Sequence, residues 1–468
     1  MLLYNIMSTR GSLLQLIAKG NIDKYLYNYY EEEPIKKSMF KSEIKKISNF
    51  SDANLSLYPE NSPSWGDTVT FKISKYGDLL TNLYLSFELP QISVEDIVGE
   101  DESIADSNFR VKWQDYIGYV AIEKVILRIG GQKIDEQTGE FMQFHTDLYD
   151  KTWSKLCMIG HEKNLIIPST KIDKQYIYVP LKFFFCNDIL KALPIYALNY
   201  HDIEVEVKMR RWEDLYFILS TLTDNVSDFE SKTSKLFYRH TNNTIEQKNL
   251  TGLRLDCNYI FLDDPERKYF LENKHEILIQ QVQYQEQSCL SNEKIFLNFN
   301  NPIKELIYVI QSSDIEDLGE IFNYSGKPVY LPSSITEFTE TLWFQIPYKH
   351  LLDKASLQLN GNDRVSEKDY KYWHLVQNYE IYRNKLEHNI YTFSFGLDKK
   401  ENTGSCNFSE LDEVSLSIKL SNSTNEIYHR NSSTTSIGPG TNNKIKVYGI
   451  NYNILKIDSG MGAVMFPY

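Results

Sequence analysis

Residues 125–135 read Val-Ile-Leu-Arg-Ile-Gly-Gly-Gln-Lys-Ile-Asp, and this stretch predicts a β-hairpin. Gly130-Gly131 leaves only two residues to reverse the chain between two strand-like segments. A two-residue hairpin turn needs positive φ at one or both central positions, which glycine adopts without steric cost. Asn360-Gly361 predicts a second hairpin for the same reason. Tyr76-Gly77-Asp78 divides two alternating segments, and we interpret it as a third turn of this kind.

Segments of period two surround these turns in both halves of the chain, and each is typical of a strand with one buried face. Their inward positions are Val69, Phe71 and Ile73; Leu83, Leu85, Phe87 and Leu89; Ile203, Val205, Val207 and Met209; Ile303, Glu305, Ile307 and Val309; and Val414, Leu416, Ile418 and Leu420. Helical patterns are few, and one begins at Asp264-Pro265-Glu266, where Asp264 can cap the helix. The pattern predicts an all-β chain of antiparallel sandwiches.

Composition excludes several classes of function. The formal net charge of −13 makes the chain a poor general partner for nucleic-acid phosphates, so we expect no direct nucleic-acid binding. One basic stretch, within residues 36–46, follows Glu31–Glu33, and we interpret it as a solvated or subunit-facing strand. The five cysteines form no C-x-x-C pair, which argues against a disulfide framework or a zinc site.

A search for catalytic motifs indicates no enzyme. His275-Glu276 begins like a zinc-protease helix, but Ile279 stands where the second ligand is needed. Nucleophile elbows and phosphate-binding loops of the known patterns are absent from the sequence. We therefore expect no catalytic residues, no cofactor and no metal.

A series of blocks resembles the major capsid proteins of nucleocytoplasmic large DNA viruses. In chain order these blocks are Gly11–Gly20, Ile73–Leu80, Trp113–Gly118, Ile129–Asp135, Val179–Pro194, Asp263–Arg267, Asn301–Leu306, Leu359–Arg364, Ser405–Ser409, Asn451–Leu455 and Ser459–Gly462. One such block is weak evidence, but about ten in the family's order make the resemblance specific.

The resemblance implies two consecutive eight-stranded antiparallel jelly-roll sandwiches with few short helices. Together with the polar stretch at residues 214–250, it predicts an N-terminal arm at 1–37, a first jelly roll at 38–213, a connecting segment at 214–250 and a second jelly roll at 251–468. The structural turns that match the family are Gly77, Asp78, Gly130, Gly131, Asn360 and Gly361. Family chains tend to start near the position of Met7, so we expect residues 1–6 to be dispensable.

The function implied by the resemblance is structural. Members form homotrimers that serve as pseudo-hexagonal capsomers and tile the outer shell of a large icosahedral DNA virus. The expected partners are the chain itself, neighbouring capsomers and minor capsid proteins. The shell lies over an internal viral membrane that the chain does not span. The expected location is the virion, after assembly in the host cytoplasm.

Departures from the family pattern keep alternatives open. Asn301 stands where the family usually has His, residues 401–405 replace a Gln-Pro-Ser-Gly run, and Lys45-Lys46 replace arginines. A minor capsid paralogue of the same fold therefore remains an alternative. Outside the capsid class, a jelly-roll lectin would show affinity for glycans, and a jelly-roll enzyme would need a close His and carboxylate cluster.

Overall fold

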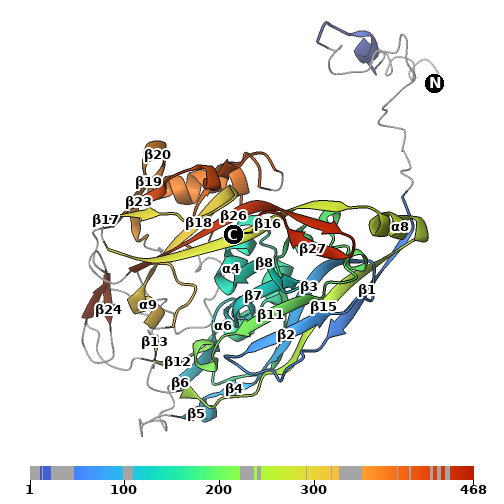
Figure 1. The fold of residues 1–468 in the computed structure, drawn as a ribbon. Helices are drawn as coiled ribbons and strands as arrows, with labels where there is room; N and C mark the ends of the chain where they lie inside the picture. The colour runs from blue at the N-terminus through green and yellow to red at the C-terminus, as the bar shows by residue number, and fades with distance from the viewer. Residues whose placement is uncertain are drawn as a thin grey trace, which may run out of the picture. The chain divides into compact units, whose positions relative to one another are not determined.

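The computed structural model separates the chain into two compact units, Met1–Asn49 and Phe50–Tyr468. The described residues are 11–12, 14–22, 47–98, 109–221, 237–239, 244–290, 292–317, 319–325, 350–386, 388–399, 402–421, 425–428, 434–437 and 443–467. The basic stretch within residues 36–46 and most of the predicted arm lie outside this set. Figure 1 shows that the second unit is built mainly from strands. Within the described residues, no helix combines the length and the apolar character that crossing a membrane requires.

The first sandwich consists of two four-stranded antiparallel sheets. One sheet has the order β1 (Phe50–Leu57), β15 (Thr251–Leu262), β3 (Leu79–Leu89) and β10 (Gln175–Pro180). The other has the order β2 (Thr68–Ile73), β11 (Ile203–Met209), β7 (Ile122–Ile129) and β8 (Gln132–Thr138).

The second sandwich repeats this arrangement. One sheet has the order β16 (His275–Cys289), β26 (Asn443–Asp458), β18 (Pro302–Ser312) and β21 (Tyr391–Ser394), with β22 (Cys406–Asn407) on β18 and β27 (Met461–Val464) on β26. The other has the order β17 (Asn292–Phe296), β23 (Val414–Leu420), β19 (Leu352–Leu359) and β20 (Asn362–Asp369).

The order of the principal strands identifies the fold. When they are counted along the chain, both sandwiches read 1-8-3-6 in one sheet and 2-7-4-5 in the other. This is the double Greek-key order of a jelly roll. The predicted all-β fold of two consecutive jelly rolls is therefore confirmed. The count of eight strands in each is not, because further short strands accompany the principal ones.

Short elements fill the connections between the principal strands. The additional strands are β4 (Ile92–Ser93) with β9 (Lys171–Ile172), β5 (Ile97–Val98) with β14 (Thr244–Ile245), β6 (Phe109–Trp113) and β13 (Phe237–Arg239) with β12 (Tyr216–Thr221), and β24 (Asn425–Tyr428) with β25 (Thr434–Ile437). The helices are α3 (Ile117–Val120), α4 (Gly139–Tyr149), α5 (Trp153–Met158), α6 (Lys163–Ile166), α7 (Phe184–Asn187), α8 (Asp264–Glu272) and α9 (Ser313–Asp317).

Strand pairing moves the predicted boundary between the jelly rolls. β15 pairs with β1 and β3, so it is the last strand of the first jelly roll and not the first strand of the second. The described parts of residues 214–250 also pair with first-domain strands, because β12 pairs with β6 and β14 with β5. The alternation of apolar and polar residues did not show to which jelly roll these segments belong, because each pairs with a strand more than 100 residues away. Helix α8 follows β15 and begins at the predicted place, although Asp263 and not Asp264 is its cap.

The turn predicted at residues 76–78 is not a hairpin. β2 and β3 lie in different sheets, so this segment carries the chain across the sandwich. Gly77 has no positive φ, but a Cβ at this position would lie 2.8 Å from the Cβ of Tyr259 and 3.2 Å from the carbonyl oxygen of Ile260. The glycine is required by close packing against β15, which the local sequence does not reveal.

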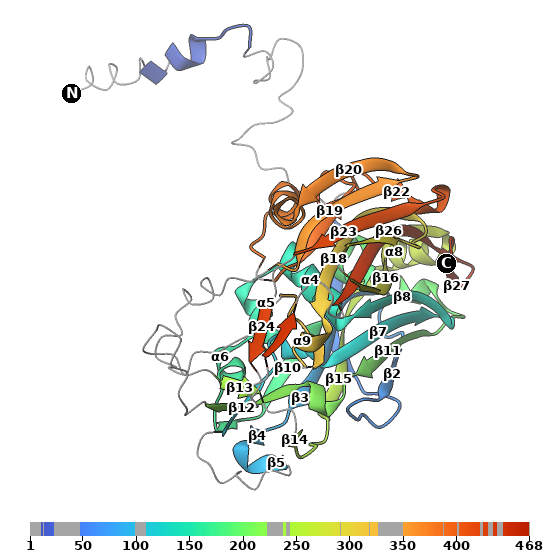
Figure 2. The same ribbon diagram turned by 90° about the vertical axis from the view of Figure 1, so that its left-hand side faces the viewer.

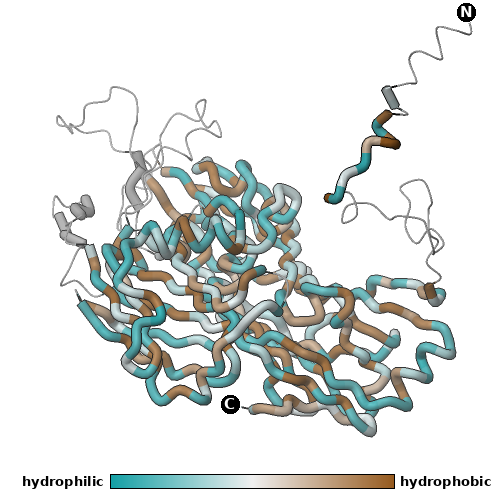
Figure 3. Tube along the Cα trace, turned by 90° about the horizontal axis from the view of Figure 1, so that it is seen from above, coloured by the Kyte–Doolittle hydropathy of each residue, from teal (hydrophilic) through white to brown (hydrophobic). Residues whose placement is uncertain are grey.

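The alternating segments become strands, and hydrophobic and hydrophilic positions alternate along many of them (Figure 3). β11 alternates between buried and half-buried residues throughout. β18 differs, because all of its residues from Ile303 to Ser312 are buried. Both of its faces are covered, so the strand has no solvent face despite its alternating sequence.

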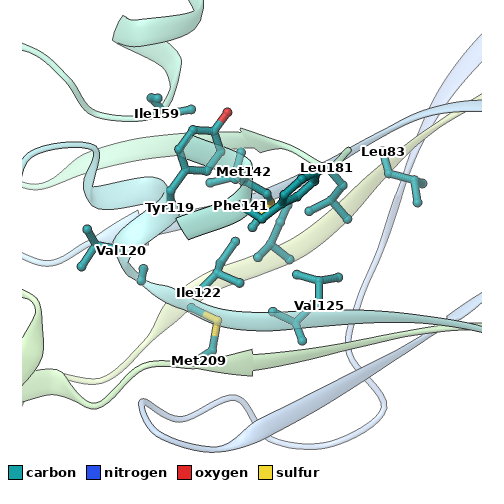
Figure 4. Close-up of a cluster of buried hydrophobic side chains, with 14 of the residues drawn as sticks. Leu83, Tyr119, Val120, Ile122, Val125, Phe141, Met142, Ile159, Leu181 and Met209 are labelled. Carbon is teal, nitrogen blue, oxygen red and sulfur yellow. The ribbon is translucent and has the colours of Figure 1, made fainter. Parts of the chain in front are cut away.

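The core of the first jelly roll includes helices as well as strands. Figure 4 shows Phe141 and Met142 of α4 beside Val125 of β7 and Met209 of β11. Tyr119 of α3 lies in the same cluster and is fully buried. The continuous core runs on into the second jelly roll, where it includes Ile279, Ile307 and Tyr448 among others. The two jelly rolls therefore share one apolar core across their contact.

The hairpin between β7 and β8 turns on Gly130 and Gly131, whose φ angles are +56° and +78°. A Cβ on Gly131 would have open space, whereas a Cβ on Gly130 would overlap the ring of His201. We expect Gly131→Val to cost about 1–3 kcal/mol through backbone strain alone. Gly130→Val adds a steric clash, so melting temperatures should fall in the order wild type, Gly131→Val, Gly130→Val. Unchanged melting of both variants would contradict the hairpin.

Candidate functional site: the junction between the two jelly rolls

Helix α4 carries most of the polar contacts between the two jelly rolls. It follows β8 directly, and its first turn is capped by Thr138, whose hydroxyl accepts a hydrogen bond from the Phe141 amide. Nearly all of its side chains are buried. Figures 1 and 2 show α4 between the first sandwich and the long strands of the second. A helix in this position must satisfy its polar side chains with partners from the other jelly roll.

A buried ion pair joins α4 to β26. The Lys446 ammonium donates to Glu140 Oε1 at 2.7 Å and to Gln311 Oε1 at 2.8 Å. The Tyr448 hydroxyl donates to Glu140 Oε2 at 2.8 Å, so both carboxylate oxygens are satisfied. Burial alone would raise the pKa of Glu140, but the charge and hydrogen bond of Lys446, the Arg210 charge and the Tyr448 hydrogen bond together lower it below its ordinary value. The Glu140 carboxylate is therefore ionised at neutral pH.

A second buried carboxylate, Glu305 of β18, receives two tyrosine hydroxyls. Tyr149 at the end of α4 donates to one oxygen, and Tyr382 donates to the other at 2.5 Å. Burial, and then the Glu305 charge, raise the pKa of both tyrosines well above the ordinary value. Both hydroxyls therefore keep their protons, and the Tyr149 hydroxyl bridges the two jelly rolls.

The third contact pairs Asp147 of α4 with His388. The imidazole Nδ1 lies 3.0 Å from Asp147 Oδ2 and 2.9 Å from the amide nitrogen of Gln143. Burial would raise the pKa of Asp147, but the hydrogen bond and charge of His388 lower it below its ordinary value. Polar groups on three successive turns of α4 thus meet partners in the second jelly roll.

The fourth contact involves Asp135 of β8, which is 1% exposed. Its Oδ1 accepts from the Val282 amide of β16 at 2.9 Å, and its Oδ2 accepts from Gln137 at 2.6 Å. Burial raises the pKa of Asp135 to about 7. The carboxyl therefore holds a proton in the folded protein over a pH range where the unfolded chain has lost it.

This raised pKa predicts a pH dependence. Between about pH 4 and pH 7 the folded state binds more protons at Asp135 than the unfolded state does, so its contribution to stability is lost as pH rises. Asp135→Asn cannot ionise but keeps an oxygen for the Val282 amide. Relative to the wild type, we expect the free energy of unfolding of the variant to rise by on the order of 3 kcal/mol between pH 4 and pH 8.

Urea denaturation at several pH values measures this gain, with Asp264→Asn as the control because the Asp264 side chain is 87% exposed. Parallel stability curves for wild type and Asp135→Asn would contradict the assignment.

The predicted turn residues lie at several places and do not form one site. Asn360 and Gly361 connect β19 to β20 with φ of +48° and +76°. Asp78 accepts two hydrogen bonds from Arg267 of α8, at 2.9 and 3.0 Å, and one from the Leu262 amide at 2.8 Å. Asp78 therefore fixes α8, the link between the jelly rolls, against the first sandwich.

Sequence reasoning missed the junction residues Glu140, Asp147, His388 and Lys446. The members of each pair are separated by more than 200 positions, and no local motif connects them. Glu305 was the one junction residue with a signal in the sequence, because it is a charged residue at an inward position of an otherwise apolar alternating strand. Within the described residues, no group of His, Cys, Asp and Glu side chains is arranged to hold a metal ion.

Comparison with known proteins identifies the family. Residues 38–263 match the model described as the major capsid protein N-terminus, and residues 266–463 match that of the large eukaryotic DNA virus major capsid protein. The chain is 27% identical to the major capsid protein of Phaeocystis pouchetii virus, covering 97% of this chain and 99% of that protein. It is 26% identical to the major capsid protein of Paramecium bursaria Chlorella virus 1, with the same coverage.

Solved structures agree on the fold. A capsid model of PBCV-1 superposes with a TM-score of 0.67 at 23% identity, covering 92% of this chain and all of that one. The Faustovirus major capsid protein superposes with a TM-score of 0.68 at 12% identity, covering 94% of each chain. The chain belongs to the family of major capsid proteins of large eukaryotic DNA viruses and is a structural protein of the virion capsid, not an enzyme.

Proposed function

We propose that three copies of this chain form a homotrimeric, pseudo-hexagonal capsomer and that such capsomers tile the outer shell of an icosahedral virion. The observation that carries this proposal is the repetition of one strand order in two jelly rolls within a single compact unit. Three such chains present six similarly built lobes, which suits a pseudo-sixfold block with closed threefold symmetry. The buried junction supports the proposal, because it holds the two lobes of each chain together.

Exposed apolar side chains also support assembly. Trp153, Leu190, Tyr200, Tyr379 and Leu397 are each between 68% and 90% exposed. Large side chains of this kind on both jelly rolls favour burial against other chains over permanent contact with water. We propose that contacts within the trimer and with neighbouring capsomers or minor capsid proteins cover part of this surface.

Strand pairing supports a proposal for the bounds of the two jelly rolls. We propose that the first jelly roll ends with β15, that α8 is the link, and that the second begins with β16. We propose that residues before β1 act in shell formation. We also propose that the shell is assembled in the host cytoplasm and lies over an internal viral membrane.

The proposed trimer predicts the mass of the purified protein. We expect native mass spectrometry and light scattering at micromolar concentration to report three times the chain mass of 54.8 kDa. Deleting residues 1–35 should leave the trimer intact and impair shell formation. A protein that stays monomeric at micromolar concentration would contradict the proposed capsomer. Copy number per virion, measured by quantitative mass spectrometry, distinguishes the abundant shell protein from a minor paralogue.

A further inference from the structure

A lysine-rich pocket lies where the first jelly roll meets the second. Its cavity of about 730 Å³ is bounded by segments of β3, α4, α5 and α7, and from the second jelly roll by Gln280 and Lys399. Its charged lining residues are Lys155, Lys182, Lys191, Lys399, Asp150 and Asp188. The four lysines outnumber the two aspartates, although the chain as a whole carries a net charge of −13. The pocket is therefore locally cationic on an acidic protein.

Lys182 is the central feature of this pocket. The residue is 6% exposed and, within the described part of the chain, no Asp or Glu carboxylate forms an ion pair with it. Lys155, the charge that acts most strongly on Lys182, directs its ammonium to Asp150 at 3.2 Å. Burial, and then the Lys155 charge, lower the pKa of Lys182 well below its ordinary value. The Asp150 charge favours the protonated amine but does not offset its burial.

His145 supplies an unsatisfied ring nitrogen in the same pocket. Its ring stacks on Tyr149 with a centroid separation of 4.6 Å. Its Nδ1 is buried and, within the described residues, has no hydrogen-bond partner. The aspartates of the lining are already engaged, since Asp150 pairs with Lys155 and Asp188 accepts from the Leu190 amide at 3.0 Å. A buried ring nitrogen without a hydrogen-bond partner and a buried lysine without a carboxylate partner thus line the same cavity.

We propose that this pocket binds a small phosphate-type oxyanion through Lys182, Lys155 and Lys191. Lysine ammonium groups act as point charges with three donors each, which suits the tetrahedral arrangement of phosphate oxygens. No arginine lines the pocket, and the paired donors of arginine are what planar carboxylates prefer. A cavity of this size accommodates an anion as large as pyrophosphate. Because Gln280 and Lys399 belong to the second jelly roll, the bound anion would add to the contacts that join the two.

The experiment uses the purified full-length protein in its native oligomeric state, titrated with inorganic pyrophosphate against sodium chloride of equal ionic strength. We expect saturable binding with one site per chain by calorimetry, and a rise in melting temperature of about 2 °C or more at saturation. Citrate serves as a carboxylate of comparable charge and should bind more weakly. Citrate binding as tight as that of pyrophosphate would overturn the phosphate assignment.

Matched lysine variants locate the binding. Lys182→Met should weaken pyrophosphate binding by about tenfold or more. Without the anion, the melting temperature of this variant should be no lower than that of the wild type, because the substitution removes a buried amine that has no carboxylate partner. Lys191→Met replaces a half-buried lysine of the same pocket and provides an independent variant if Lys182→Met folds poorly. Lys294→Met is the control, because Lys294 forms an exposed pair with Glu413 and is not among the pocket's lining residues. Absence of saturable binding, or binding that both pocket variants leave unchanged, would overturn the proposal.

Discussion

Lys446→Met is expected to lower the free energy of unfolding by about 3–5 kcal/mol. The substitution removes the ammonium partner but leaves the Glu140 carboxylate buried between the jelly rolls, where the Tyr448 hydroxyl still donates to it. Desolvation of an unpaired buried charge is the largest single electrostatic penalty available in a folded chain. Equilibrium urea denaturation measures the loss, and the transition should broaden if the two jelly rolls begin to unfold separately.

A double variant separates the lost contact from the stranded charge. Lys446→Met combined with Glu140→Gln removes both charges and keeps an acceptor for Tyr448, so it should be more stable than Lys446→Met alone. Lys444→Met provides the control on the same strand. The Lys444 side chain is 33% exposed and pairs with Glu316, so its loss should cost no more than about 1 kcal/mol. Equal losses for Lys444→Met and Lys446→Met would show that the junction pair has no special role.

Gly139→Ala is the second change with a large expected effect, a loss of about 3 kcal/mol. Helix propensity alone predicts the opposite sign, because alanine is favoured over glycine in a helix by about 1 kcal/mol. Gly139 is the first residue of α4, and a Cβ there would overlap the backbone carbonyl oxygens of Tyr119 and Ile122. Backbone atoms cannot rotate away, so α4 would have to move and disturb the junction contacts that it carries.

Thermal melting and urea denaturation check this expectation, with Gly131→Ala as a matched control. A Cβ on Gly131 meets nothing within 4 Å, so that variant bears only the strain of its positive φ, about 1 kcal/mol. The loss should therefore be clearly greater for Gly139→Ala. A gain in stability for Gly139→Ala would contradict the close approach of α4 to α3 and to the start of β7.

The family and the all-β class could be predicted because their signals are local or follow one another in order. The Gly130-Gly131 and Asn360-Gly361 turns require positive φ, and the structure gives both pairs such angles. Alternation over residues 203–209 places every second side chain in the core, whatever strand lies beside it. The boundary at residue 251 and the hairpin at residues 76–78 were wrong, since both depend on which distant strand pairs with β15 or β3.

The class of fold, the principal strands, two of the turns and the family could be predicted from the residues, because periodicity and ordered motifs act over a few residues at a time. How the two jelly rolls meet could not, since it depends on the packing of the whole chain. Glu140 and Lys446 are 306 positions apart, and Lys182 lines a cavity with residues of both jelly rolls. The packing of whole sheets and helices decides whether a buried charge has a partner, and no local pattern of residues encodes that outcome.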